Sequence, residues 1–394
     1  MKAALKNLAL LVASLSCGLL FMELALRLLG LSYPLFMQPD TNLGWSFRPN
    51  VSGWSQNENT VYLRTNRFGF RGADWSEQPA SDRMRIAVLG DSFVDSSNLA
   101  DEHVLTSVIE EHLAACPALA NNRAEVLNFG VSGYGTAQQY LMLQQQVASF
   151  RPNLVLLALY VGNDVMNNSL ALSAENQKAR PYFVELPSGE LRLDTSFRDT
   201  DIFLQAIESD WQRRLVNKSY ILQALKQFYV TKSIAPSSIE PKNSYAAQTA
   251  IYFPPESSQL FSSPPNDVWL SAWSVTEKLL LRMRDWVLQQ HWGFGLVIIP
   301  APIEALPGED VRRAASHAFN VAELDYPAKR ISNLAAQSGI PYLSLVDSFQ
   351  AYGDRERVYL YGFPPALGNG HLNATGNQVS GKLIADWLCG RLSS

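Results

Sequence analysis

Residues 85–93 read RIAVLGDSF, an apolar run that ends in Gly90-Asp91-Ser92. The run is rich in Val, Ile and Leu and lacks strict alternation, which is typical of a strand covered on both faces. Four similar runs follow along the chain, at residues 125–129, 154–160, 295–299 and 341–346. Helical patterns occupy residues 104–115, 137–150, 268–290, 322–338 and 374–391. This alternation predicts a three-layer α/β/α fold around a mostly parallel, five-stranded sheet.

The composition excludes several classes of protein. Of the 394 residues 47% are hydrophobic and 17% charged, which is ample apolar material for a core. The net charge is −4 and no dense basic cluster occurs, so nucleic acid is a disfavoured partner. Three cysteines, Cys17, Cys116 and Cys389, are too few for a disulfide scaffold or a cysteine zinc site. If Cys17 lies in a membrane segment, a bridge between the other two stays open.

The N-terminus looks like a targeting segment. Lys2 and Lys6 precede an uncharged run over residues 7–22, and apolar residues continue to Leu31. A short basic start before such a run indicates a secretory signal or an uncleaved signal anchor. No convincing cleavage site follows, so we expect residues 1–32 to form a membrane anchor with the rest of the chain exported. A cleaved signal is the alternative.

The remaining chain divides into an extension and a main domain. Residues 33–80 read as loops and short strands, and residues 81–394 carry the alternating pattern. Between the third and fourth strands lies an interval much longer than an ordinary crossover. We expect an insertion at about 166–266, with a hairpin at 182–193, a helix at 202–229 and a Pro/Ser-rich loop at 233–265. It is expected to form a cap or side wall, or else decoration that does not touch the substrate.

Polar residues follow the predicted strands at four points. Ser92 follows the first strand, Gly133 the second and Asn163 the third, and His371 precedes the last helix. Reactive groups of open α/β sheets gather beyond the carboxyl ends of the strands. Acyl transfer needs a nucleophile, a base and donors for the oxyanion, which is this set. Each residue alone has an ordinary interpretation, as a helix cap, a hinge or a turn residue, but their coincidence favours catalysis.

These blocks, in this order, resemble those of the SGNH/GDSL hydrolase superfamily. The resemblance covers residues 60–165 and 295–391, and residues 65–72 (TNRFGFRG) are similar to membrane-anchored, envelope-associated members. It implies a flavodoxin-like SGNH-hydrolase fold, with Ser92 as nucleophile and His371 as base. It also implies an oxyanion hole made by the backbone amides of Ser92 and Gly133 and the side chain of Asn163. No cofactor and no metal are expected.

The chain departs from the family at the acidic residue. The family usually places an aspartate two or three residues before the histidine, where this chain has Asn369 and Gly368. Asn369 is therefore expected to orient His371, although an amide stabilises imidazolium poorly. A backbone carbonyl could orient the ring instead, which would leave a Ser–His dyad. Asp91 and Asp164 are expected to support the site.

The sequence thus predicts a serine-dependent esterase. Its expected substrate is an acyl ester, acetyl esters included, on an envelope or extracellular polysaccharide or lipid. One alternative is an O-acetyltransferase that acts on a glycan, which differs only in the acceptor of the acyl group. The other is a catalytically degenerate protein that binds glycan or acts as a scaffold, for which Asn369 is the main support. The oligomeric state stays open.

Overall fold

A parallel five-stranded sheet forms the centre of the molecule. The structure, a computed structural model, describes residues 1–119, 123–175, 178–233 and 255–393. The sheet has the order β11-β10-β7-β5-β6, and every pairing in it is parallel. Its strands are β5 (Arg83–Gly90), β6 (Arg123–Gly130), β7 (Leu154–Tyr160), β10 (Gly293–Ile299) and β11 (Tyr342–Ser344). These are the five predicted strands.

The strand order determines where the loops meet. β5 pairs with β6 from Arg83↔Arg123 to Gly90↔Gly130, and its other edge pairs with β7. The chain therefore leaves β5 first toward one side of the sheet and later returns to the other. In such doubly wound sheets, the crevice at the carboxyl ends beside this switch point is the usual ligand site. The loops after β5, β6 and β7 lie there.

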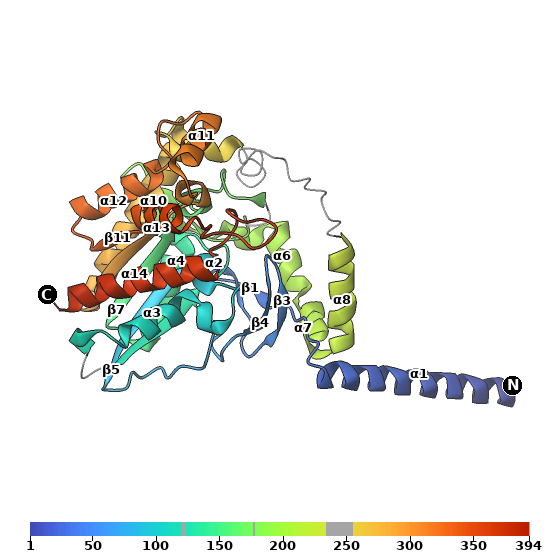
Figure 1. The fold of residues 1–394 in the computed structure, drawn as a ribbon. Coiled ribbons are helices and arrows are strands. Elements are labelled where there is room, and N and C mark those ends of the chain that lie inside the picture. Colours follow the sequence, from blue (N-terminus) through green and yellow to red (C-terminus); the bar gives the residue numbers. More distant parts are fainter. Residues whose placement is uncertain (120–122, 176–177, 234–254, 394) are drawn as a thin grey trace.

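Helices cover both faces of the sheet (Figure 1). On one face α3 (Leu105–Leu113) packs against α14 (Ala374–Leu392). On the other face α10 (Asp267–Gln289) packs against α4 (Thr136–Gln145) and β10, and α12 (Tyr326–Gln337) packs on β10 and β11. Burial on both faces explains the apolar character of β5, in which residues 86–89 are fully buried. This is the expected three-layer fold.

Some elements differ from the sequence-based expectation. The helices α11 (Glu309–Phe319) and α13 (Val346–Glu356) were not predicted, and α13 takes the end of the expected strand at 341–346. The short helices α2 (Ser92–Asp95) and α5 (Asp164–Asn167) follow β5 and β7 directly. A final group of short 3-10 turns completes the connections, among them η2 (Pro117–Leu119), η3 (Val147–Phe150), η6 (Pro255–Phe261) and η7 (Pro302–Ala305).

The N-terminal extension forms two antiparallel hairpins. They are β1 (Met37–Asp40) with β2 (Gly44–Phe47), and β3 (Ser52–Gln56) with β4 (Thr60–Arg64). The first is joined to the main domain by the Trp45 indole, which donates to the Ser132 carbonyl at 3.0 Å, and by the Leu43 carbonyl, which accepts from Gln138 at 2.6 Å. The extension therefore packs on the loops that follow β6.

The described part of the insertion contains a hairpin, and it has three helices where one was expected at 202–229. The hairpin joins β8 (Tyr182–Glu185) to β9 (Leu191–Asp194), close to prediction. The helices are α6 (Asp201–Glu208), α7 (Asp210–Lys218) and α8 (Tyr220–Ser233). Ser219 has an extended backbone, with φ −124° and ψ 121°, which ends α7 and turns the chain. Most of the predicted loop at 233–265 lies outside the described residues.

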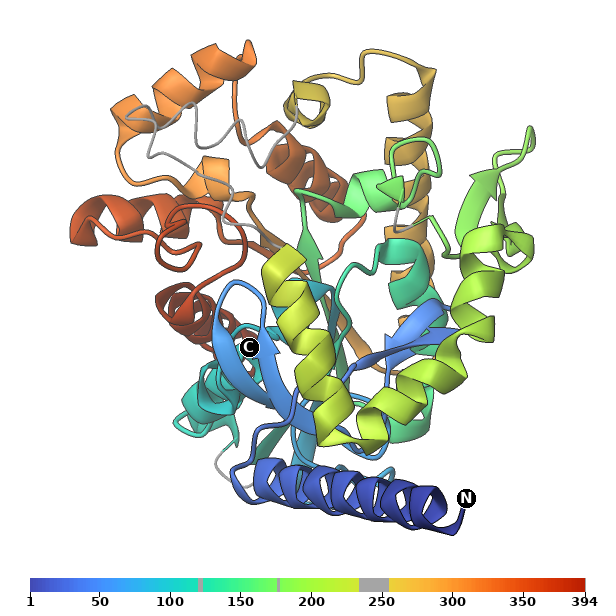
Figure 2. The same ribbon diagram turned by 90° about the vertical axis from the view of Figure 1, so that its right-hand side faces the viewer.

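The N-terminal helix stands apart from the rest. α1 (Lys2–Leu28) has a mean hydropathy of 2.1 in its most apolar window and none of that window is buried. Figure 1 shows it extending away from the body, and in Figure 2 it lies along the lower edge of the view. Its 27 residues span about 40 Å at 1.5 Å per residue, which exceeds the hydrocarbon thickness of a bilayer. By length and composition it is a candidate membrane span or signal sequence.

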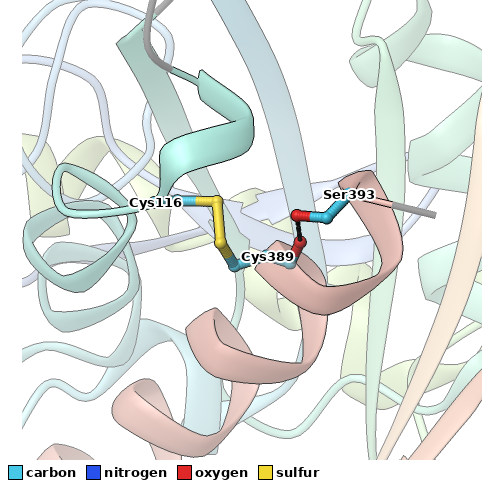
Figure 3. The surroundings of a disulfide bond; sticks show 3 residues. All are labelled: Cys116, Cys389 and Ser393. Atoms are coloured by element: carbon cyan, nitrogen blue, oxygen red, sulfur yellow. Dashed lines mark hydrogen bonds between the residues drawn. A yellow bond between two sulfur atoms is a disulfide. The ribbon is translucent and has the colours of Figure 1, made fainter.

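A disulfide closes the α3–α14 face. Cys116 and Cys389 are bonded, with their Cα atoms 5.6 Å apart (Figure 3). The bond links the turn after α3 to the last turns of α14, two segments separated by 273 residues. The bridge left open by the sequence is therefore present, and Cys17 is a free, exposed thiol on α1.

Candidate active site

Ser92 lies at the sharp turn between β5 and α2. β5 ends at Gly90, where a side chain would overlap Val94 of the following helix, so the turn requires glycine. Asp91 caps α2 by accepting a hydrogen bond from the Phe93 amide at 2.9 Å. Ser92 is thus the first residue of α2, at the carboxyl edge of the sheet.

His371 faces Ser92 from the loop before α14. Its Nε2 lies 2.8 Å from Ser92 Oγ, although 279 residues separate the two in sequence. The loop is held by Asn373, whose side chain caps α14 by accepting from the Gly376 amide at 3.0 Å. The imidazole also packs against the Phe93 ring, with centroids 5.1 Å apart. Serine and histidine are therefore in hydrogen-bond contact.

The second ring nitrogen of His371 contacts a carboxylate from the N-terminal extension. Glu58, in the turn between β3 and β4, has Oε1 2.8 Å from His371 Nδ1. Its Oε2 accepts from the His371 backbone amide at 3.1 Å and from Asn98 at 3.3 Å. A side chain at Gly370 would overlap Glu58 Oε1, and Gly370 has φ +78°, so glycine allows this approach. The result is a Ser92–His371–Glu58 chain of hydrogen bonds.

The expectation that Asn369 orients the imidazole is wrong in this structure. The Asn369 Oδ1 accepts from the adjacent Gly370 amide at 2.7 Å and bonds to no ring nitrogen of His371. The physical reason is that Glu58 already occupies Nδ1. A backbone carbonyl does not take that position either. Asn369 instead lines the cleft beside the site.

The charge of Glu58 controls the ionisation of His371. Burial lowers the pKa of His371, but the hydrogen bond and charge of Glu58 outweigh it and hold the pKa above its usual 6.5. Burial raises the pKa of Glu58, yet the contacts with His371 lower it overall. Glu58 is therefore ionised at neutral pH, where it favours the Nδ1–H tautomer and leaves Nε2 to accept the serine proton.

Three donor groups are candidates for an oxyanion hole. Within the described residues, no hydrogen bond is found from the backbone N–H groups of Ser92 and Gly133. Gly133 has φ +78°, a conformation that favours glycine. Asn163 uses one amide hydrogen on Asp91 Oδ2 at 3.0 Å, and the second remains available. This set is suited to an oxyanion.

The comparison with family models matches one part of the chain. Residues 86–185, which contain Ser92, Gly133 and Asn163, match the model of the GDSL-like lipases and acylhydrolases. Over these residues the chain is similar to that family. No curated protein sequence matches it.

Solved structures similar to this chain include esterases and a lipase. An acetyl xylan esterase, AlAXEase, is 14% identical, with a TM-score of 0.36 over 78% of this chain and 98% of that one. A lipase/acylhydrolase from Enterococcus faecalis is 14% identical, with a TM-score of 0.36 over 78% and 96%. A catalytic mutant of Axe2, an acetylxylan esterase from Geobacillus stearothermophilus, is 11% identical, with a TM-score of 0.37 over 78% and 94%. TM-scores this low carry no information about substrate.

Two buried aspartates, Asp91 and Asp164, lie beside the candidate site, where support was expected. Burial raises the pKa of Asp91 to about 6, against the stabilising hydrogen bonds from Phe93 and Asn163. Burial and the charge of Asp91 hold the pKa of Asp164 well above its usual range. Asp164 accepts from the Tyr160 amide at 2.9 Å, which fixes the end of β7. Asp91 positions Asn163, and Asp164 positions the loop that carries it.

A cleft of about 930 Å³ opens onto the site. Its walls come from the turns after β5 and β7, from the insertion and from the loop before α14. The lining includes Met166, Leu172, Gln259, Asn266, Trp269 and Pro302. Glu58 and His371 are its only ionisable side chains other than Tyr160 among the described residues. A larger hollow of about 1270 Å³ lies beside β6, around Arg85 and Glu125, and contains neither Ser92 nor His371.

The described residues include no group of three or more His, Cys, Asp or Glu side chains placed to hold a metal ion.

The sequence analysis missed Glu58, because a single glutamate in a polar hairpin turn has no distinguishing sequence signal. The absence of the usual aspartate before His371 was the only hint that a carboxylate should come from elsewhere.

Proposed function

We propose that Ser92, His371 and Glu58 are the catalytic triad of this hydrolase. The observation that carries the proposal is the pair of 2.8 Å contacts, from His371 Nε2 to Ser92 Oγ and from His371 Nδ1 to Glu58 Oε1. A nucleophile in contact with a base, and a base oriented by a carboxylate, is the arrangement that activates serine on unrelated folds. If Ser92 served only as a helix cap, neither its contact with His371 nor the contact between His371 and Glu58 would be needed.

The first half of the reaction forms an acyl-enzyme. Ser92 Oγ attacks the ester carbonyl while His371 Nε2 takes its proton. The carbonyl oxygen becomes an oxyanion, which accepts from the amides of Ser92 and Gly133 and from Asn163. The C–O bond to the alcohol then breaks and His371 returns the proton to the leaving alkoxide. The acyl group remains on Ser92. His371, whose imidazolium form Glu58 stabilised, is a neutral imidazole again.

The second half transfers the acyl group to water. His371 takes a proton from the water as its oxygen attacks the acyl carbonyl, and a second oxyanion forms in the same hole. The bond to Ser92 Oγ breaks, Ser92 regains its proton from His371, and a carboxylic acid is released. A sugar hydroxyl in place of water would give an O-acetyltransferase. No feature of the described cleft favours that acceptor over water.

We infer a neutral acyl ester of an envelope polysaccharide as the substrate class. The described lining contains no lysine or arginine, so the cleft offers no cation to a phosphate or carboxylate group. It offers amide groups from Gln259 and Asn266, which suit hydroxyl-rich chains. An anchor formed by α1 would hold an exported domain near such polymers. The degenerate scaffold loses its main support, because Glu58 supplies the carboxylate that Asn369 lacks.

The test compares the full-length protein, in detergent micelles, with its Ser92→Ala variant on an O-acetylated neutral oligosaccharide. We expect wild-type protein to release acetate and the variant to release none above the uncatalysed rate. Transfer of acetyl groups to an added unacetylated oligosaccharide would favour the transferase. Hydrolysis of an activated aryl acetate without hydrolysis of the oligosaccharide would contradict the proposed substrate class. It would still support the proposed catalytic triad. Equal rates for both proteins would contradict the triad.

A further inference from the structure

We propose that α6, α7 and α8 form an apolar platform that lies in the headgroup layer of the bilayer crossed by α1. This inference rests on the proposed membrane anchor and extends it. Outside the N-terminal 31 residues, the described chain exposes 17 large hydrophobic side chains, and nine of them lie on these three helices. The platform consists of Ile202, Leu204, Ile207, Trp211, Leu215, Leu225, Phe228, Tyr229 and Val230.

The apolar face of α8 points away from the body. On its inner side Gln223 is buried, where its side-chain oxygen accepts from Ser32 Oγ at 2.9 Å and from the Tyr33 amide at 2.7 Å. Leu225 lies two residues further along, on roughly the opposite side of a helix with 3.6 residues per turn. Its neighbours on that face, three and four residues on, are Phe228 and Tyr229. These three side chains are 50%, 54% and 68% exposed.

Helices α6 and α7 are attached to the body in the same way. Phe203 is buried, and buried Asp210 forms an ion pair with Arg48 of the extension. The Asn217 side chain accepts from the Leu35 amide at 2.7 Å. These contacts attach both helices to the body, while the side chains of Trp211 and Leu215 are 63% and 51% exposed. The platform is thus a well-fixed surface, and its exposed apolar groups are not the result of a loosely attached segment.

The end of α1 is bound directly to the platform. The Glu23 carboxylate accepts from Ser219 Oγ and from the amides of Tyr220 and Ile221, at 3.0 to 3.1 Å. It therefore caps the first turn of α8, where helix N–H groups lack intrahelical partners. Arg27 donates to the Lys218 carbonyl at 2.8 Å and lies 4.6 Å from the Tyr220 ring centroid. These contacts fix the direction of α8 relative to α1.

That direction places the platform at the bilayer surface. In Figures 1 and 2, α8 runs across the direction of α1, and α6, α7 and α8 lie on the side of the body from which α1 extends. Residues 2–22 of α1 cover about 31 Å, which matches a hydrocarbon core of about 30 Å. Glu23 then stands at its edge. Because Glu23 contacts the start of α8, the platform lies at headgroup level.

The side chains of the platform suit that layer. Trp211 and Tyr229 are the aromatic types enriched at membrane interfaces. Up to residue 231, α7 and α8 carry four basic side chains, Arg213, Arg214, Lys218 and Lys226, and one acidic one, Asp210, while α6 carries the acidic Asp201 and Glu208. Amphipathic helices with a basic polar face bind anionic lipid surfaces through apolar burial and charge together. The occupant we commit to is the surface of the bilayer that contains α1, with anionic lipid.

The test measures depth in the membrane with the full chain. A single label is attached at Leu225→Cys, in a Cys17→Ser background that keeps the Cys116–Cys389 bond. The protein is reconstituted into vesicles of phosphatidylethanolamine and phosphatidylglycerol that carry a doxyl group near the headgroup or deep in the acyl chain. We expect the shallow doxyl lipid to quench the label at position 225 more strongly than the deep one. Trp211→Cys is the second probe and should behave alike.

Two controls separate the platform from the anchor. Leu288→Cys, on α10, matches Leu225 in exposure (52% against 50%) and should not be quenched by either lipid. Ser14→Cys, in the middle of α1, should be quenched best by the deep lipid. Quenching at position 14 without quenching at 225 and 211 would overturn the platform and keep the anchor, and no quenching at position 14 would overturn the anchor. A label at 225 that is shielded from an aqueous quencher but not quenched by lipid would indicate a protein partner and also overturn the proposal.

Discussion

At the scale of single residues, His371 contacts a carboxylate that lies outside the blocks of sequence that resemble the hydrolase family. Glu58 holds both the ring and the backbone of His371, in contacts that span 313 residues of sequence. A carboxylate at Nδ1 orients imidazole and stabilises imidazolium irrespective of the strand or turn that supplies it. The departure at Asn369 therefore does not imply lost activity.

We predict that Glu58→Gln lowers kcat by about 10²–10⁴-fold, the range for losing acid–base function or the correct tautomer. Because Glu58 raises the pKa of His371, the wild-type acid limb of kcat/KM should lie above pH 6.5. Removing the charge lowers that pKa, so the limb should move to lower pH. The rate profile with an activated ester from pH 4 to 9 measures both effects. An unshifted limb would show that Glu58 does not act through the imidazole.

Asn369→Ala is the matched control for Glu58. Its amide oxygen accepts only the neighbouring Gly370 amide among the described contacts, so its loss should leave the acid limb where it is. A shift in Asn369→Ala as large as that in Glu58→Gln would restore Asn369 as the orienting residue.

A second residue-scale prediction concerns the oxyanion. Asn163→Ala should keep the fold and lower kcat with little change in KM, by about 10²–10³-fold, as for the loss of one oxyanion donor elsewhere. Asp91 holds Asn163 through a 3.0 Å hydrogen bond, so Asp91→Asn should give a smaller loss of the same kind. Steady-state kinetics with an activated ester separate kcat from KM. A loss confined to KM would place Asn163 in ground-state binding.

Most of the candidate site could be predicted from the sequence, but Glu58 could not. Ser92, Gly133, Asn163 and His371 each end a strand or precede a helix, and parallel strands bring such positions to one edge. The proximity of Ser92, Asn163 and His371, which line one cleft, therefore followed from topology. Glu58 is in a hairpin turn that the sheet does not position, and only the packing of the extension against the domain brings it to His371. A contact of that kind has no period or spacing to reveal it.

At the scale of elements, burial decided what could be predicted. The strands were predictable because both faces are buried, as in β5 and β7, which makes apolar runs. The helix expected at 202–229 is divided at Ser209 and Ser219, since polar residues that end helices also occur inside them. α11 was missed because only Ala315 on it is buried, which leaves a weak apolar stripe. The predicted boundaries of the insertion still await a direct test.

The element-scale prediction concerns the disulfide. Cys116–Cys389 fastens the end of α14, and the start of α14 carries the His371 loop. The Cys116→Ser, Cys389→Ser double variant should unfold with a free energy about 2–5 kcal/mol lower, the usual cost of losing a native disulfide. Urea unfolding of oxidised wild type, reduced wild type and the double variant measures it. Equal midpoints for all three would show that the bond adds nothing to stability.

At the scale of the whole molecule, the chain is a three-layer α/β/α domain with one apolar helix projecting from it. Figure 1 shows α1 leaving the body on the side of α7 and α8. With Lys2 and Lys6 at its outer end, a cytoplasmic N-terminus and an exported hydrolase domain are the expected topology. The exposed apolar surface of α1 has no protein partner among the described residues beyond its last two turns.

We predict that carbonate washing does not release the protein from membranes and that a reporter fused after residue 394 is active only when exported. The reason is that α1 is long and apolar enough to span a bilayer. A matched control replaces residues 1–32 with a cleavable signal, which should give a released protein. A soluble wild-type protein whose N-terminus begins beyond Leu31 would show that the segment is a cleaved signal.

The most direct test of the catalytic account is covalent labelling of the full-length protein with a serine-reactive phosphonate, followed by peptide mapping. We expect one label, on Ser92, and none on Ser92→Ala. Glu58→Gln should be labelled more slowly, and its labelling rate should decline at a lower pH than that of wild type. Circular dichroism confirms that the variants fold. Labelling of another serine, or undiminished labelling of Ser92→Ala, would contradict the assignment of Ser92 as the nucleophile activated by His371 and Glu58.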